Sequence, residues 1–354
     1  MAARLPVSGP CAWYGKEMAR SSRWVRTLRP AAIREIDAAL RAAQARGLPW
    51  HETTRERFPL PGLKDDLAEI AAQLEDGCGL VKLRGLPVER YEAPELRQVW
   101  FGIGSHLGLP VYQNCRGELM REIRDEGAGV GERYGQLKTE GHAGVFLSSY
   151  ARTVSSGALR FHTDRCDVVG LLCVRQAQAG GLSRLCSSAT VHNEILARRP
   201  DLLEILFQDF YRSRLGEEAG GAEQVYRLPV FGLRDGKLTS HYSLTYIEAA
   251  QRVAGVPPLT AAQREAIGLL MALAEALSFE MALEPGDMQF LNNHVVYHAR
   301  TAFTDDPVAG RTRLLYRLWL STPNSRALPA GHEVLWREIE AGRPRGGIGQ
   351  APVP

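Results

Sequence analysis

Hydrophobic side chains in the first hundred residues recur every three or four positions, the spacing that makes one face of an α-helix apolar. In the first such segment the apolar face is formed by Ile33, Ile36, Leu40 and Ala43. Pro30 is well placed to begin this helix, and Gly47 is well placed to end it. The pattern therefore predicts a helix between these two residues.

Two more helices are predicted in the same part of the chain. The second carries leucine and isoleucine on one face within residues 67–74 and stops at Gly77. The third covers residues 93–106. Residues 1–110 are therefore expected to be mainly helical.

Strands are marked by apolar and polar positions that alternate. Within residues 80–84, Val81 and Leu83 point to one side and Lys82 and Arg84 to the other, which predicts a strand with one wet face. Further strands are predicted in the second half of the chain, where a hairpin turns at an Asp-Gly pair. They are expected at residues 230–233, 238–242, 288–291 and 314–320.

The remaining segments also fit an α+β protein. Residues 113–156 are rich in glycine, serine and charge and are predicted to be a long loop, including the glycine-rich run 127–131. Thr260 and Gln263 form a capping box that begins one more helix. Because helices come first and short strands later, we expect a strand-built core with flanking helices in one domain, residues 1–354.

Composition excludes several classes of function. A net charge of +3 over 354 residues gives no electrostatic reason to expect a nucleic-acid partner. The apolar runs are much shorter than the roughly 20 residues of a membrane span, and the N-terminus has no signal-peptide core. The six cysteines include no Cys-x-x-Cys pair. We expect a soluble, cytoplasmic protein, and the sequence leaves its oligomeric state open.

The segment with the clearest chemistry contains His162 and Asp164. On a strand, side chains two positions apart point to the same face, so this imidazole and carboxylate would lie side by side. They are two of the three ligands of a facial triad, which leaves three metal positions open and is diagnostic of non-haem Fe(II) oxygenases. A lone His-x-Asp is weak evidence, because it occurs by chance in many chains.

The third ligand should be a histidine from a distant strand, and the candidates are His294 and His298. Their spacing would suit a helical zinc pair, but the residues between them are Val-Val-Tyr, which favours an extended segment. No glutamate follows His294 as in metalloproteases. We favour His298 because of the arginines that follow it.

Arg313 and Arg317 are four positions apart on the predicted strand, so their side chains would point to the same face and both could lie in the interior. Buried arginines are costly unless each meets an anion, and a dicarboxylate cosubstrate would supply one. The alternative, that Arg311, Arg313 and Arg317 are surface charges, stays open from this pattern alone.

Taken together, the motifs resemble the taurine dioxygenase and clavaminate synthase-like family of Fe(II)/2-oxoglutarate-dependent dioxygenases. Singly the motifs are weak, but in combination and in this order they are specific. The resemblance covers about residues 80–322, with the motifs concentrated in residues 155–322. The matching segments are Phe161-His162-Thr163-Asp164, Gly180-Gly181-Leu182-Ser183, residues 286–293, residues 298–303 and Arg313-Leu314-Leu315-Tyr316-Arg317.

This resemblance implies a double-stranded β-helix, or jelly-roll, with helices outside it. It implies that His162, Asp164 and His298 bind Fe(II), and that Arg313 and Ser183 hold 2-oxoglutarate. The segment before Arg313 is slightly longer than in the plainest members, so whether Arg311 or Arg313 holds the cosubstrate stays open.

The implied reaction uses O₂ to hydroxylate an unactivated C–H bond of a small molecule, with succinate and CO₂ as coproducts. Desaturation or oxidative cyclisation with the same cofactors is an alternative. A redox-inactive metal-binding jelly-roll is an alternative of another class. The substrate is expected to be anionic or amino-acid-like.

Four residues are candidate substrate contacts. Arg317 matches a position that contacts a substrate anion in some members of the family. Asn293 could line the site or stabilise a turn. Arg165 would face away from Asp164 if the strand continued, so surface exposure competes with a substrate contact. Gln113 begins the expected loop.

Overall fold

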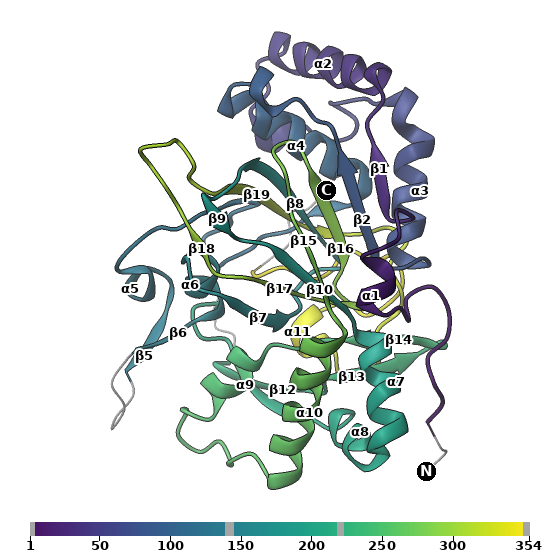
Figure 1. The fold of residues 1–354 in the computed structure, drawn as a ribbon, viewed down its shortest axis with the longest axis vertical. Helices are drawn as coiled ribbons and strands as arrows, with labels where there is room; N and C mark the ends of the chain where they lie inside the picture. Colours follow the sequence, from purple (N-terminus) through teal and green to yellow (C-terminus); the bar gives the residue numbers. More distant parts are fainter. Residues whose placement is uncertain (1–3, 139–144, 218–222, 350–354) are drawn as a thin grey trace.

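Two β-sheets pack against each other in the middle of the molecule, and helices cover the outer face of each sheet (Figure 1). The computed structural model describes residues 4–138, 145–217 and 223–349. This mixed architecture confirms the helix-and-sheet composition that the sequence predicted.

The larger sheet has seven strands and is mostly antiparallel. Its order is β1 (Val25–Thr27), β2 (Leu80–Arg84), β16 (Met288–Asn292), β8 (Val168–Arg175), β19 (Leu314–Ser321) and β3 (Leu109–Pro110), and β4 (Met120–Ile123) also pairs with β19. The smaller sheet is ordered β15 (Phe279–Met281), β10 (Ser183–Ser187), β17 (Val296–Arg300) and β7 (Leu159–His162).

Helices form the two outer layers. The larger sheet is covered by α2 (Pro30–Ala45), α3 (Lys64–Glu75) and α4 (Ala93–Leu107), drawn in purple to blue in Figure 1. The smaller sheet is covered by α7 (Ser188–Arg198), α8 (Pro200–Leu206), α9 (Leu244–Ala250) and α10 (Ala261–Leu277). No helix in the described part of the chain is long and apolar enough to cross a bilayer.

Shorter elements fill the edges. Two-stranded pairs are β5 (Gln136–Lys138) with β6 (Val145–Leu147), β9 (Ala179–Gly180) with β18 (Phe303–Thr304), β11 (Phe210–Ser213) with β12 (Val225–Leu228), and β13 (Phe231–Arg234) with β14 (Lys237–Ser240). The short helices are α1 (Gly15–Met18), α5 (Val130–Tyr134), α6 (Ser149–Thr153) and α11 (Glu333–Trp336).

Strand β19 shows how alternation builds the site. Its even-numbered residues, such as Tyr316 and Leu318, pack against the outer helices. Its odd-numbered residues Leu315 and Trp319 belong to the core between the two sheets. Because side chains alternate along a strand, Arg317 faces the same interior, where it is 5% exposed.

The predicted helices and strands are confirmed, with differences in two places. Lys82 was expected on a wet face, but it is 8% exposed and its Nζ lies 2.7 Å from Oδ2 of Asp287, so that expectation was wrong. The range 113–156, of which residues 139–144 lie outside the described residues, was expected to be a long loop. It contains β4, which pairs with β19, the paired strands β5 and β6, and the short helices α5 and α6. Short elements of this kind depend on tertiary partners that a local pattern does not reveal.

Candidate metal and cosubstrate site

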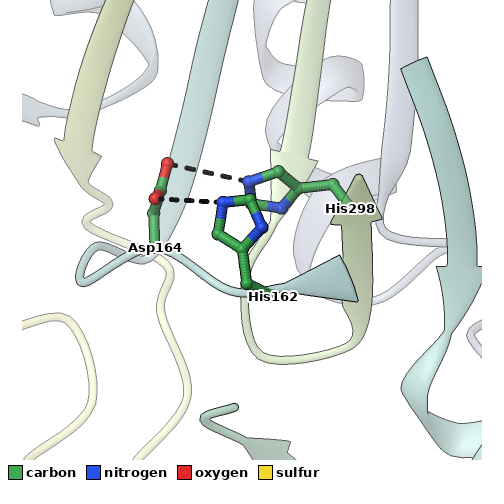
Figure 2. A group of neighbouring side chains, drawn as sticks. All are labelled: His162, Asp164 and His298. Atoms are coloured by element: carbon green, nitrogen blue, oxygen red, sulfur yellow. Dashed lines mark ion pairs between the residues drawn. The ribbon is translucent and has the colours of Figure 1, made fainter. Parts of the chain in front are cut away.

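Three side chains, two from neighbouring strands and one from the segment that follows the first strand, converge at one end of the smaller sheet. His162 ends β7, His298 lies directly opposite it on β17, and Asp164 follows β7 by two residues. Nε2 of His162 lies 3.8 Å from Oδ1 of Asp164, and Nε2 of His298 lies 3.8 Å from Oδ2. Figure 2 shows the three side chains pointing toward one another. Their ligand atoms all lie within 4.8 Å of one another, so one metal ion could reach all three.

The protonation states of these groups suit a metal. Burial lowers the pKa of both imidazoles, that of His298 to about 3, so both rings are neutral at ordinary pH. Nδ1 of His162 lies 2.8 Å from the carbonyl of Arg160, which directs its Nε2 lone pair toward Asp164. Burial opposes ionisation of Asp164, but the charge of Arg317 and the hydrogen bond from Trp319 lower its pKa below the usual value. Two neutral imidazoles and one carboxylate fit Fe(II).

His294, the rival third ligand, is engaged elsewhere. It lies in the turn between β16 and β17, where its Nε2 is 2.8 Å from Oδ1 of Asp167 and its Nδ1 is 2.7 Å from Oγ1 of Thr239. Its ring also packs on Trp336, with centroids 4.9 Å apart. Because both ring nitrogens already have partners, His294 has no free lone pair to offer, and the structure brings His298 to the other two residues instead.

A cavity of about 50 Å³ adjoins the three ligands and contains the residues expected to hold a cosubstrate. Arg313 and Ser183 both line it, together with apolar side chains such as Val169 and Leu171. Arg313 is 6% exposed, and its Nη1 is buried without a hydrogen-bond partner among the described residues. Burial lowers the pKa of its guanidinium to about 10. A buried cation without a partner fits the carboxylate of a bound dicarboxylate.

Arg311, the other candidate for the cosubstrate, lies outside this cavity. Its side chain is exposed, and its backbone forms an isolated bridge with Asp306 at the turn before β19. The geometry therefore favours Arg313 as the cosubstrate residue.

The four candidate substrate residues have different surroundings. Arg317 lines the cavity, and its Nη1 lies 3.6 Å from Oδ2 of Asp164. Asn293 is buried and accepts a hydrogen bond of 2.9 Å from the backbone N–H of Asp164. It therefore supports a ligand segment rather than facing an open pocket.

Arg165 and Gln113 are also buried. Arg165 is 7% exposed, and its Nε donates to the carbonyl of Leu335 at 3.0 Å, so the structure does not place it on the surface. Gln113 has no exposed surface and accepts a hydrogen bond of 2.7 Å from Nε of Arg317. The side chain of Gln113 therefore reaches the site through Arg317.

Two site residues were not anticipated from the sequence. Trp319 donates from Nε1 to Oδ2 of Asp164 at 2.9 Å. It has the same strand parity as Arg313 and Arg317, and that signal could have identified it. Arg300 lines the cavity two residues after His298, and its guanidinium donates to the carbonyls of Thr153, Ser155 and Gly157. It anchors the segment that leads into β7.

The chain is similar in sequence to known proteins. The family model described as taurine catabolism dioxygenase TauD, TfdA family matches residues 44–319. FR-33289 synthase of Streptomyces rubellomurinus is 30% identical over 332 residues, which cover 92% of this chain and 93% of the relative. The taurine hydroxylase-like protein SAT17 of Stachybotrys chartarum is 32% identical over 297 residues, 82% of this chain and 74% of the relative.

Solved structures share the fold. Asparagine oxygenase in complex with Fe(II), 2S,3S-3-hydroxyasparagine and succinate superimposes with a TM-score of 0.65 at 19% identity, over 93% of this chain and 100% of that one. The non-haem iron oxygenase OrfP with Fe and alpha-ketoglutaric acid gives a TM-score of 0.60 at 17% identity, over 90% and 100% of the two chains.

Proposed function

Since the chain belongs to the taurine catabolism dioxygenase TauD, TfdA family and is an Fe(II)- and 2-oxoglutarate-dependent oxygenase, we propose that it hydroxylates an unactivated C–H bond of a small anionic or amino-acid-like molecule. The observation that carries the proposal is the convergence of His162, Asp164 and His298 beside a cavity lined by Arg313, whose Nη1 has no hydrogen-bond partner among the described residues.

In this proposal the three converging side chains would hold the metal and leave its remaining positions for 2-oxoglutarate and O₂. When bound, Fe(II) together with 2-oxoglutarate and O₂ supplies the oxidising chemistry and releases succinate and CO₂. Arg313 pairs with the far carboxylate of 2-oxoglutarate, and the hydroxyl of Ser183 donates a further hydrogen bond to it. Apolar residues such as Val169, Leu171 and Leu315 line the cavity and keep bulk water away from the reacting atoms.

Arg317 is the proposed recognition residue for an anionic group of the substrate. It is buried at the cavity wall, and its charge is directed toward the metal ligands. Two more relatives have names that state small-molecule substrates, a nucleotide and an amino acid: uridine-5'-phosphate dioxygenase from a Streptomyces species and L-asparagine oxygenase from Streptomyces coelicolor. These names support the substrate class and leave the individual compound to experiment.

The architecture is part of the same proposal. Two antiparallel-rich sheets that enclose the site between them support a double-stranded β-helix core. We also propose that residues 1–354 form a single domain, in which residues 1–110 pack on the core, and that the protein acts in the cytoplasm. All six cysteines are free thiols, which suits a reducing compartment.

The direct test is consumption of 2-oxoglutarate. Purified protein with Fe(II), ascorbate and air should convert 2-oxoglutarate to succinate, and a panel of amino acids, phosphate monoesters and phosphonates should reveal the compound that stimulates this conversion. The product should be heavier than that compound by one oxygen atom. An Arg313→Met variant should lose the activity, and an Arg311→Met variant should keep it. No succinate from the wild-type protein under any condition would favour a redox-inactive metal protein.

A further inference from the structure

The two carboxylate oxygens of Asp164 have different surroundings. Oδ2 accepts a hydrogen bond of 2.9 Å from Nε1 of Trp319, and Nη1 of Arg317 lies 3.6 Å from the same oxygen. Each oxygen lies 3.8 Å from one ligand histidine, Oδ1 from Nε2 of His162 and Oδ2 from Nε2 of His298. Among the described residues, no side chain or backbone group donates a hydrogen bond to Oδ1. One oxygen is therefore held by the protein, and the other is left for a ligand.

Arg317 is itself fixed in place by Gln113. The side-chain oxygen of Gln113 accepts from Nε of Arg317 at 2.7 Å, and its Nε2 donates to the backbone carbonyls of Arg317 at 2.8 Å and of Leu119 at 3.0 Å. These two donor contacts fix the orientation of the amide, because the opposite orientation would place its oxygen against two carbonyl oxygens. Gln113 thus holds both the side chain and the backbone of residue 317.

The residue type at position 113 also matters. A neutral acceptor holds Arg317 without cancelling its charge, whereas a glutamate would form an ion pair with it and weaken its attraction to other anions. The guanidinium also packs on the ring of Trp319, with its central carbon 4.9 Å from the ring centroid. Gln113, Arg317 and Trp319 thus form one connected unit, and all three are buried.

We propose that Trp319 and Arg317, the latter positioned by Gln113, clamp Oδ2 and so limit Asp164 to a single metal-ligating oxygen. A carboxylate can bind a metal through one oxygen or through both. Binding through both would occupy one of the three positions that a facial triad leaves open, and a chelating cosubstrate would then compete with the protein for it. The clamp would keep that position available. This inference rests on the proposed ligand set.

The test compares metal binding with cosubstrate binding in the full-length protein without oxygen. The variants are Trp319→Phe, which removes the N–H and keeps the aromatic ring, and Gln113→Leu, which removes the support of Arg317. Matched controls are Trp24→Phe and Gln98→Leu, because Trp24 and Gln98 donate to the carbonyls of Met18 and Leu48, away from Asp164. Mn(II) binding is followed by electron paramagnetic resonance, and 2-oxoglutarate binding by the visible band of its Fe(II) chelate.

We expect Trp319→Phe and Gln113→Leu to weaken 2-oxoglutarate binding about tenfold, the lower end of the effect of losing an outer contact to a metal ligand. Mn(II) affinity should fall less than 2-oxoglutarate affinity, because Oδ1 still binds the metal in both variants, and the controls should match the wild type in both measurements. Glutarate has the same two carboxylates without the keto oxygen, so its competition constant should not change.

Three results would overturn the inference. Unchanged 2-oxoglutarate binding in both variants would show that no clamp is needed. Parallel loss of Mn(II) and 2-oxoglutarate would show that the contacts orient Asp164 for the metal as a whole. Equal weakening of glutarate and 2-oxoglutarate would place the effect at the far carboxylate. If the wild-type protein bound no metal, the proposed ligand set would be contradicted. That result differs from the three above, which contradict only the clamp on Asp164.

Discussion

The side-chain oxygen of Asn293 accepts a hydrogen bond of 2.9 Å from the backbone N–H of Asp164. Asn293 belongs to the turn between β16 and β17, whereas Asp164 follows β7. The amide nitrogen of Asn293 also donates to Sγ of Cys166 at 3.2 Å. One buried side chain therefore joins the turn before His298 to the segment that carries the other two ligands.

Replacing Asn293 by Ala should disturb both stability and metal binding. It leaves the N–H of Asp164 buried without an acceptor, at a cost of about 1–3 kcal/mol in the free energy of unfolding. It also frees the backbone of a metal ligand, so Mn(II) affinity should fall by roughly tenfold or more. Urea denaturation and Mn(II) titration measure the two effects.

The matched control for this change is Asn292→Ala. Asn292 is also buried, but its Nδ2 donates to the carbonyl of Leu74 and to Oε2 of Glu75, and its Oδ1 accepts from the backbone N–H of His294, so it contacts none of the three proposed ligands. This variant should lose a similar amount of stability and keep the Mn(II) affinity of the wild type. Equal loss of Mn(II) affinity in both variants would show that general destabilisation is the cause.

Arg313→Lys should weaken 2-oxoglutarate binding, because a lysine cannot form the bidentate contact that a guanidinium makes with a carboxylate. A hydrogen bond to a charged group contributes about 1.5–3 kcal/mol, so the dissociation constant should rise roughly 10- to 100-fold. The exposed Arg311→Lys is the control and should leave it unchanged. A larger effect at position 311 than at position 313 would reverse the assignment of the cosubstrate residue.

His332 should make the fold sensitive to acid. Burial lowers the pKa of its imidazole to about 4, and His294 and Arg212 act in the same direction. The unfolded chain, with a pKa near 6.5, binds a proton between these values when the folded protein does not. Stability is therefore lost as the pH falls from about 6.5 to 4, by up to roughly 3 kcal/mol.

Substituting His332 by Gln should remove this part of the pH dependence. Urea denaturation at pH 7 and pH 4.5 should show a smaller decrease for His332→Gln than for the wild type. His51 has an exposed side chain, and the control His51→Gln should retain the full decrease. An unchanged decrease in His332→Gln would mean that other groups cause the acid sensitivity.

The main helices and the central strands could be predicted from the sequence because their patterns are local. A capping box marks the start of α10, and the alternation of side chains placed Arg317 of β19 and Arg313 just before that strand in the interior; the structure contains the capping box and buries both arginines. Side chains at every second position of this segment point inward, which correctly placed Arg313 and Arg317 in the interior. Trp319 follows the same alternation, but it carries no charge and so was not identified as a site residue. The sequence therefore identifies a site residue when its position in the strand and the chemistry of its side chain both point to the site.

What could not be predicted depends on partners distant in sequence. Lys82 is buried because it pairs with Asp287, which is about two hundred residues away in the sequence. Likewise, β4 forms a strand because β19 lies beside it. Arg165 is buried because the C-terminal segment supplies the carbonyl of Leu335. None of these contacts leaves a local pattern.

The central claim is that His162, Asp164 and His298 bind Fe(II) in an arrangement that also binds 2-oxoglutarate. Anaerobic addition of Fe(II) and 2-oxoglutarate should produce the weak visible charge-transfer band of the chelate in the wild type and in His294→Ala, and no band in His162→Ala or His298→Ala. A band that survives in His298→Ala and disappears in His294→Ala would contradict the ligand set. No band in the wild type at saturating metal would contradict the oxygenase assignment itself.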